Sequence, residues 1–298
     1  MKSSIRSASH AGSWYDDDPI SLAKELSYYL SSSKQFSEYN SLKSIIVPHS
    51  GLEYGGPVAA KAFINVNPKN YDRVVILGPS HYEYFKGCAL TSFSKFETPF
   101  GDVDVDTSTT KKLLEDSKHF FSFPKSSDVQ EHSIEMEIPF LKYIFDDKKF
   151  SIIPMVIGDG NLSKNIELGK CIYDLYEDPK TLFVISSDFC HWGQDFDYVY
   201  YNKKFKNIWE STEDLDKQAL DIIAEMDSKK FDAYIKKTKN TICGRNPITI
   251  VLSIIEEYQK NHQNKKISFD TAGYSQSEKC KTMNDSSVSY AAGVNFIL

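Results

Sequence analysis

The sequence has no compact set of cysteines and no long apolar run. Its five cysteines are scattered and no two of them form a CxxC pair, which argues against a disulfide framework and against a structural zinc knuckle. The N-terminal residues contain no apolar core of signal-peptide length, and no segment approaches the roughly 18 apolar residues of a membrane span. We therefore expect free thiols in the cytoplasm, or also in the nucleus, and no membrane insertion.

An excess of positive charge is also absent. The 35 Lys and Arg are outnumbered by 41 Asp and Glu, the net charge is −6, and no long basic run occurs. We expect no nucleic-acid partner, because such proteins carry clustered basic residues. The 298 residues are 41% hydrophobic, which is sufficient for a sizeable core.

Apolar runs closed by Gly, Pro, Ser or Asp recur along the chain and predict buried strands. They lie at residues 44–51, 72–81, 150–158 and 181–191, and helical patterns occur at residues 57–66, from near Leu162 and from near Glu213. Continuous apolar strands of this kind belong in a sheet covered on both faces. The sequence thus predicts an α/β fold with a mostly parallel central sheet flanked by helices, in one domain spanning residues 1–298.

Two other regions have a different pattern. Residues 88–106 alternate between apolar and polar and contain turn residues, which predicts a hairpin at the sheet margin. Residues 266–277 and 286–298 are expected to form two further strands. No linker or internal repeat divides the chain.

Histidines follow three of the predicted parallel strands. His49 and His81 follow the first two, and Asp188 with His191 follows the strand at 181–191. Ligands of such sheets bind at the carboxyl ends of the strands. A single histidine is more often a core or turn residue, but three on equivalent loops favour a functional site.

Cys243 is a fourth candidate, from the segment NTICGRNPITIV. Asn246 followed by Pro247 predicts a helix N-cap and first residue, which places Cys243 in the preceding loop. The helix dipole and Arg245 would favour the thiolate, which binds metals and acts as a nucleophile. A small buried cysteine is the alternative interpretation.

Two imidazoles and a thiolate form a donor set for one iron or copper ion. We therefore predict His49, His81 and Cys243 as metal ligands, with coordination positions left open. Asp188 and His191 are the predicted acid/base groups. His132 and Glu135 are three residues apart and would share a helical face. We expect them at most to support the metal ligands, without binding the metal.

Eight blocks, nearly end to end and in order, resemble the Memo family (mediator of ErbB-driven cell motility): SHAGSWY, PHSGLEYGG, GPSH, EHSIEMEIPF, SSDFCHWGQ, TICGRNPI, YSQS and DSSVSYAAG. The resemblance implies similarity to class III extradiol dioxygenases, in which two His and one Glu hold non-haem iron. On that basis His49 and His81 match the two His ligands and His191 matches the acid/base His. Cys243 stands in place of the carboxylate, which argues against ring cleavage because a thiolate is itself oxidised.

The resemblance further implies a metal-binding, redox-linked protein with a role in cell motility and invasive growth signalling. Signalling proteins or phosphotyrosine-containing receptor segments are the implied partners, with Trp14 and Tyr54 at the pocket rim. The family's animal members carry a basic residue after CHWGQ, whereas this chain has Asp195. A negative charge there would weaken phosphate binding.

Three functions therefore remain open. The first is a redox protein or enzyme with a single metal ion, and the second is a non-catalytic regulator or peptide-binding scaffold that uses the same pocket. The third is a cysteine hydrolase, with Cys243 as nucleophile and His191 as base, although it leaves the other two loop histidines without a role.

The segment VISSDFCHWG is expected to divide its side chains by polarity. Val184 and Ile185 should pack in the sheet, Cys190 should be buried and inert, and Trp192 should cover apolar surface. His191 should be oriented by a hydrogen bond to its other ring nitrogen.

Overall fold

The computed structural model describes residues 4–116 and 118–298. Its helices within these ranges are α1 (Pro19–Ser31), α2 (Leu52–Phe63), α3 (Thr107–Asp116), α4 (Lys125–Gln130), α5 (His132–Glu135), α6 (Ile138–Phe145), α7 (Leu162–Cys171), α8 (Tyr173–Glu177), α9 (Ile208–Ala224), α10 (Ser228–Thr238) and α11 (Arg245–Asn261). Short 3-10 turns lie at η1 (Tyr39–Ser41), η2 (Pro68–Asn70) and η3 (Gln194–Phe196).

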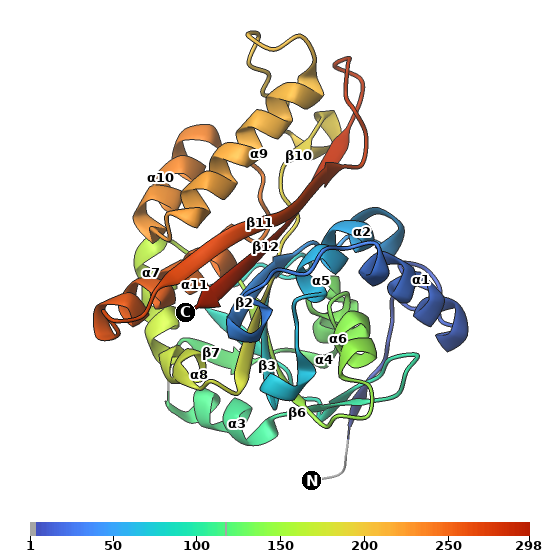
Figure 1. Ribbon diagram of the computed structural model, residues 1–298, viewed down its shortest axis with the longest axis vertical. Helices are drawn as coiled ribbons and strands as arrows, with labels where there is room; N and C mark the ends of the chain where they lie inside the picture. Colours follow the sequence, from blue (N-terminus) through green and yellow to red (C-terminus); the bar gives the residue numbers. More distant parts are fainter. Residues whose placement is uncertain (1–3, 117) are drawn as a thin grey trace.

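The strands join in one mixed sheet (Figure 1). They are β1 (Ile5–Arg6), β2 (Leu42–Val47), β3 (Arg73–Pro79), β4 (Cys88–Leu90), β5 (Lys95–Phe96), β6 (Val103–Val105), β7 (Phe120–Ser122), β8 (Ser151–Ile157), β9 (Thr181–Ser186), β10 (His191–Trp192), β11 (Ile267–Gln276) and β12 (Ser287–Ile297). The main path of the sheet runs β1-β5-β6-β8-β3-β9-β2-β12-β10.

The centre of the sheet is parallel, as the sequence predicts. β6, β8, β3, β9 and β2 run in the same direction, and β12 joins β2 in the opposite direction. The predicted marginal hairpin is the antiparallel pair β5 and β6, and the two predicted C-terminal strands are β11 and β12. The α/β prediction is therefore confirmed.

Alternate residues of the central strands enter two separate cores. In β9, Leu182 and Val184 face the core formed with α1, α2 and α6, whereas Phe183 and Ile185 face the core formed with α7, α8 and α11. Both faces of these strands are covered, which explains why the strands appear in the sequence as unbroken apolar runs. The expected burial of Val184 and Ile185 is confirmed.

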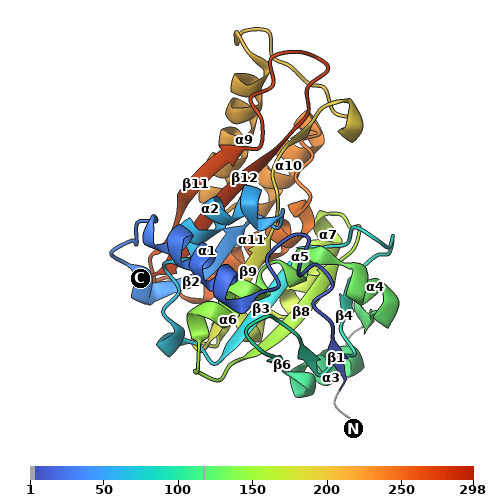
Figure 2. The ribbon, with the colours of Figure 1, turned by 90° about the vertical axis from the view of Figure 1, so that its right-hand side faces the viewer.

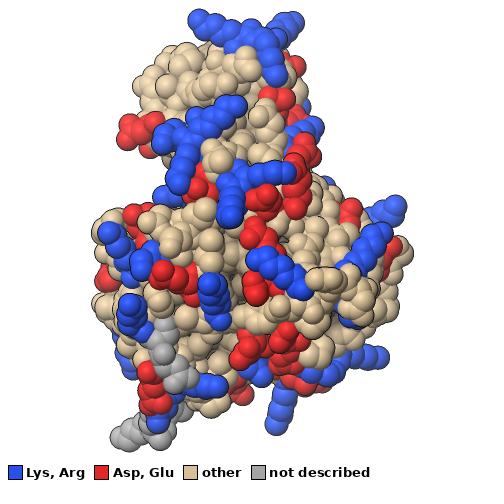
Figure 3. All heavy atoms as spheres, turned by 90° about the vertical axis from the view of Figure 1, so that its left-hand side faces the viewer, with Lys and Arg blue, Asp and Glu red and all other residues tan. Residues whose placement is uncertain are grey.

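The C-terminal strands lead out of this layered body. β11 and β12 run into an extension beside α9, which also contains the loops at residues 193–207 and 277–286 (Figures 1 and 2). On the face shown in Figure 3, basic and acidic side chains are interspersed over the body, and basic side chains gather on the extension. No helix among the described residues is long and apolar enough to cross a membrane.

Candidate metal centre

Three adjacent parallel strands present the candidate residues at one edge of the sheet. β9 lies between β3 and β2. His49, His81 and Asp188 each come two residues after the last residue of β2, β3 and β9, respectively. The shared strand direction and the equal spacing bring these loops together at the carboxyl edge.

A cluster of three histidines lies at this edge. His49, His81 and His132 each offer a ligand atom, and these atoms lie within 4.8 Å of one another. The ring centroids are 5.1 Å apart for His49 and His81 and 4.3 Å apart for His81 and His132. His132 was not expected beside the other two. α5 packs against β3 and thereby brings His132 next to the other two histidines.

Gly78 is what allows α5 to approach so closely. A Cβ atom at this position would lie 2.5 Å from the Ser133 hydroxyl oxygen, and the same hydroxyl donates to the carbonyl oxygen of Pro79 over 2.8 Å. A larger residue in place of Gly78 would push α5, and with it His132, away from the strand end.

The tautomer of His49 follows from its hydrogen bonds. Ser186 donates its only hydroxyl proton to the carbonyl of Ser133 over 2.6 Å. It must therefore accept a hydrogen bond from Nδ1–H of His49, which lies 2.6 Å away. Nε2 of His49 is left with its lone pair directed at the cluster. Burial lowers the pKa of this imidazole well below its usual value, so the ring is neutral and able to bind a metal.

His81 is held in the same tautomer by Glu131. The Nδ1–H group donates to one carboxylate oxygen over 2.9 Å, and the backbone N–H of His81 donates to the other over 2.6 Å. Burial opposes ionisation of Glu131, but the hydrogen bond and charge of His81 lower its pKa to about 2. A carboxylate behind an imidazole is the usual support of a metal-ligating histidine. The sequence pattern gave no reason to select Glu131, although this residue directly precedes His132.

His132 differs from its two neighbours because one of its ring nitrogens has no partner. Its Nδ1 atom is buried and makes no hydrogen bond among the described residues. Burial, followed by the repulsion that protonated His49 and His81 would exert, lowers the pKa of His132 to about 3. Nδ1 lies 3.7 Å from a carboxylate oxygen of Glu131, and a buried nitrogen that lacks a hydrogen bond is costly.

Cys243 contacts the cluster at one point. Its Sγ atom lies 3.3 Å from Nε2 of His49 and accepts a hydrogen bond from the backbone N–H of Asp188 over 3.2 Å. Among the described residues, the group of mutually close ligand atoms contains the three histidines and does not include Cys243. Cys243 therefore lies beside His49, on the side of the Asp188 loop.

Two expectations about the Cys243 segment are wrong. Burial raises the pKa of the Cys243 thiol, with Asp188 adding to the effect, so the metal-free protein does not favour the thiolate. The following helix begins at Arg245 and its N-cap is Gly244, not Asn246. The Asn246 side chain instead donates to the carbonyl of Gly158 and accepts from Asn165.

Asp188 and His191 lie on the same loop but have different surroundings. The carboxylate of Asp188 accepts from the backbone N–H of His49 over 3.0 Å and from the hydroxyl of Ser50, so both oxygens hold the His49 loop. His191 donates from Nδ1 to the carbonyl of Phe189 over 2.9 Å. The expected orienting hydrogen bond is thus confirmed, and Nε2 of His191 is left as a proton acceptor.

The remaining residues of VISSDFCHWG behave as expected. Cys190 and Trp192 are fully buried, and the Trp192 indole donates to the carbonyl of Tyr200 over 2.8 Å. Burial raises the pKa of Cys190 well above its usual value, in agreement with an inert thiol.

The two predicted rim residues are both partly exposed. The Trp14 ring packs against His132 with the centroids 4.6 Å apart. Tyr54 lies in the first turn of α2 with 56% of its surface exposed. The side chain of His81 is 28% exposed, so solvent reaches the cluster at His81.

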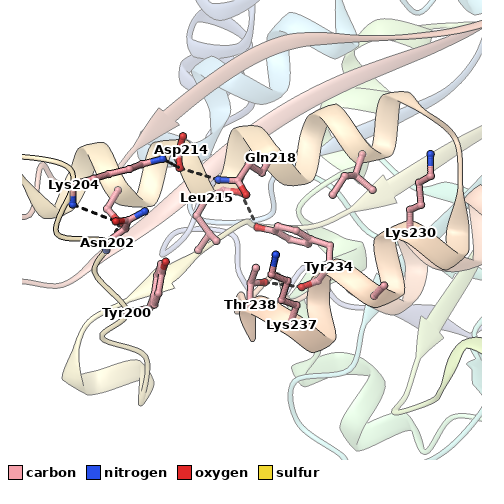
Figure 4. Close-up of a pocket in the computed structure, with 13 residues that line it drawn as sticks. Tyr200, Asn202, Lys204, Asp214, Leu215, Gln218, Lys230, Tyr234, Lys237 and Thr238 are labelled. Carbon is pink, nitrogen blue, oxygen red and sulfur yellow. Dashed lines mark hydrogen bonds and ion pairs between the residues drawn. The ribbon is translucent and has the colours of Figure 1, made fainter.

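A separate cavity of about 570 Å³ lies in the extension, between α9, α10 and the loop before α9 (Figure 4). Tyr200, Lys204, Asp214 and Tyr234 are among its lining residues. None of the predicted site residues lines this cavity.

Comparison with known proteins identifies the family of the chain. The family described as "Memo-like protein" matches residues 6–294. The chain belongs to the Memo family. Protein MEMO1 of Homo sapiens is 42% identical over 290 residues, which cover 97% of this chain and 96% of the human protein. The memo-1 homolog of Caenorhabditis elegans is 40% identical, over 98% of this chain and 83% of its own length.

Membership of the Memo family thus extends over nearly the whole chain. Protein MEMO1 of Xenopus laevis is similar to the same extent, with 42% identity over 98% of this chain and 97% of its own. Among solved structures, an uncharacterized protein from Escherichia coli K12 matches with a TM-score of 0.46 and 11% identity, covering 86% of this chain and 99% of its own.

Proposed function

We propose that this Memo-family protein is a redox-linked protein with one iron or copper ion held by His49, His81 and Cys243. The proposal rests mainly on the tautomers of the two histidines, because Ser186 and Glu131 engage the Nδ1 atoms and leave Nε2 as the atom that each ring can offer to a metal. Imidazole nitrogens with a soft sulfur donor suit iron and copper. When bound, the metal would supply one-electron redox chemistry and open coordination positions.

His132 competes with Cys243 for the role of third ligand. Its ligand atom lies within 4.8 Å of those of His49 and His81. Cys243 instead approaches His49 alone, at 3.3 Å, and its thiol must lose a proton on binding. Both residues fit the metal, but only Cys243 adds a sulfur ligand.

His191 would serve as the acid/base group and Asp188 would support the site. Phe189 holds His191 through Nδ1, so Nε2 is the atom that would accept or donate a proton. Asp188 would act on the metal ligands by holding the backbone of His49 and the sulfur of Cys243. His191→Ala should keep the metal and lower any turnover by about 10²-fold or more.

The cellular role follows the family expectation of motility and invasive growth signalling, in the cytoplasm or the nucleus. A non-catalytic regulator that binds signalling proteins or receptor peptides beside Trp14 and Tyr54 is the second candidate. The partly exposed ring of Trp14 against His132 favours it, because a peptide bound there would contact the metal centre. Metal binding without turnover would support this second function.

Elemental analysis and X-ray absorption of the purified protein test the proposal directly. A metal–sulfur distance of about 2.3 Å would identify Cys243 as a ligand, whereas distances of only about 2.0–2.1 Å would indicate histidine nitrogens. Cys243→Ser and His132→Ala should be compared, with Cys190→Ser as the control thiol. Retention of iron and copper binding by a His49→Ala, His81→Ala double variant would contradict the proposed site.

A further inference from the structure

The N-terminal arm, defined here as residues 5–15, borders the metal centre although it is remote from it in sequence. Its first two residues form β1, which pairs in parallel with β5. Figure 2 shows the arm as a dark blue segment that runs from β1 past α5 and on towards α1. Apart from Trp14, no residue of the arm belongs to the site predicted from sequence.

Arg6 is the most buried part of the arm, with only 1% of its surface exposed. Its Nη2 group donates to the carbonyl oxygens of Asp128 and Glu131, each over 2.7 Å. Nε donates to the same Asp128 carbonyl over 2.9 Å. The guanidinium therefore holds the backbone of Glu131, while the carboxylate of that residue holds His81.

Glu135 ties the arm to the other end of the same segment. It accepts from Nη1 of Arg6 over 2.6 Å, from the backbone N–H and Nδ1 of His10 over 2.8 and 2.9 Å, and from the hydroxyl of Tyr15 over 3.0 Å. Residues 131 and 135 flank His132. Both ends of this short ligand-bearing segment are thus hydrogen-bonded to the arm.

Trp14 completes the connection to the third histidine. Its ring packs on His132, and its carbonyl oxygen accepts from the N–H of Leu52 over 2.9 Å, three residues after His49. The arm consequently touches the segments that carry His49 and His132, and it reaches His81 through Glu131.

We propose that Arg6 is a positioning residue for the metal centre, acting through Glu131 on the orientation and tautomer of His81. A planar guanidinium holds several acceptors in fixed directions, whereas a lysine ammonium is a single flexible donor group. The inference rests on the proposed metal site, but its effect on His81 is measurable without metal.

Arg6→Lys tests this role because it keeps the positive charge and removes the planar guanidinium group. Cobalt(II) is the probe for affinity, and the ring ¹⁵N shifts of His81 report its tautomer in the metal-free protein. We expect cobalt affinity to fall about tenfold, the lower end of the usual loss for an outer support of a metal ligand. His81 should change from one tautomer to a mixture.

Arg73→Lys is the matched control. Arg73 lies at the amino end of β3, the strand whose carboxyl end leads to His81, and it also faces two carboxylates, Asp106 and Asp178, at 3.6 and 3.4 Å. The same chemical change there should leave the cobalt affinity and the His81 tautomer unaltered.

Asp128→Asn is a milder second variant if Arg6→Lys does not fold, because Asp128 accepts from Nε of Arg6 over 3.1 Å. It should shift both readouts in the same direction by a smaller amount. A folded Arg6→Lys protein that is less stable but keeps wild-type affinity and a single His81 tautomer would overturn the inference. Absence of cobalt binding by the wild type would contradict the proposed function, and the tautomer would then decide the role of Arg6.

Discussion

The two edges of the parallel sheet both bury ionisable groups, but they use them differently. At the amino edge, Lys43 is 5% exposed and donates to the carbonyls of Asp178 and Thr181, each over 2.7 Å. Arg73 at the same edge faces two carboxylates. Both groups have hydrogen-bond or ion-pair acceptors, as most polar groups at such positions do.

The carboxyl edge leaves buried atoms without partners. Nδ1 of His132 and Oε1 of Glu137 make no hydrogen bond among the described residues. Burial raises the pKa of Glu137 well above its usual value, so burial opposes ionisation of this carboxyl group. A network with unpartnered buried atoms stabilises the fold less than a saturated one, which is the expected cost of keeping donor atoms available for a ligand.

The largest contrast between the edges should appear in metal affinity. His81→Ala is expected to weaken metal binding by more than about 100-fold, beyond the loss caused by outer supports. His262→Ala is the control at the amino edge, where His262 pairs with Glu177 over 2.8 Å. Isothermal titration with cobalt(II) measures both, and equal losses would show that the two edges do not differ.

The next effect is on stability and concerns Glu135. Burial alone would raise its pKa, but the hydrogen bond from His10 and the charge of Arg6 lower it from 4.5 to about 2. This lowering of the Glu135 pKa corresponds to roughly 3 kcal/mol of folding stability, which is present above pH 4.5 and is lost as the pH falls towards 2.

Glu135→Gln should therefore destabilise the protein at pH 7 by up to this amount and by much less at pH 2. Denaturant unfolding at several pH values measures the difference. Glu177→Gln is the matched change at the amino edge, where the carboxylate is partly exposed and the expected loss is within about 1 kcal/mol. A pH-independent loss in Glu135→Gln would refute the ionised state of Glu135.

A smaller effect on the metal is expected from Glu131→Gln. The amide has a single acceptor oxygen, so it can keep only one of the two hydrogen bonds from His81, and it lacks the charge that makes the imidazole more basic. Metal affinity should therefore fall by about tenfold. Cobalt(II) titration beside the wild type checks this, with Glu167→Gln as the exposed control. Unchanged affinity would mean that Glu131 supports the fold and not the ligand.

The smallest effect on the metal is expected from Lys43→Met. Burial lowers the pKa of Lys43 from 10.5 to about 7, so the unfolded chain binds more protons between these values and wild-type stability should rise with pH there. Lys43→Met should abolish this rise and leave metal affinity within about twofold of wild type. A weaker metal site in this variant would show that the two edges are coupled.

Much of the fold was predictable because its signals are local. The apolar runs that became β2, β3, β8 and β9 report burial on both faces of the sheet, and a strand buried in this way needs no other pattern. The predicted start of α11 was wrong. Asparagine is a common N-cap residue, but the side chain of Asn246 forms hydrogen bonds with Gly158 and Asn165 instead. These partners lie about 80 residues away and leave no local signal.

The candidate site was predictable only in the parts that follow the ends of parallel strands or directly precede a helix. His49 and His81 come two residues after parallel strands, and Cys243 directly precedes Gly244, the N-cap of α11. His132 comes from a four-residue helix that has no periodic pattern to place it. Its position depends on Gly78, which admits Ser133 against β3.

Local sequence pattern thus predicted the central and C-terminal strands, the direction of the sheet and the edge at which the candidate ligands lie. It could do so because burial and chain direction can be read from consecutive residues. The tertiary structure decided which histidine ring nitrogens lie close together and which already form hydrogen bonds. Ser186 and Glu131 set the tautomers of His49 and His81, and Arg6 reaches Glu131 from 125 residues away. A hydrogen-bond partner depends on distances of about 3 Å between atoms, and packing alone brings residues so far apart in sequence to that distance.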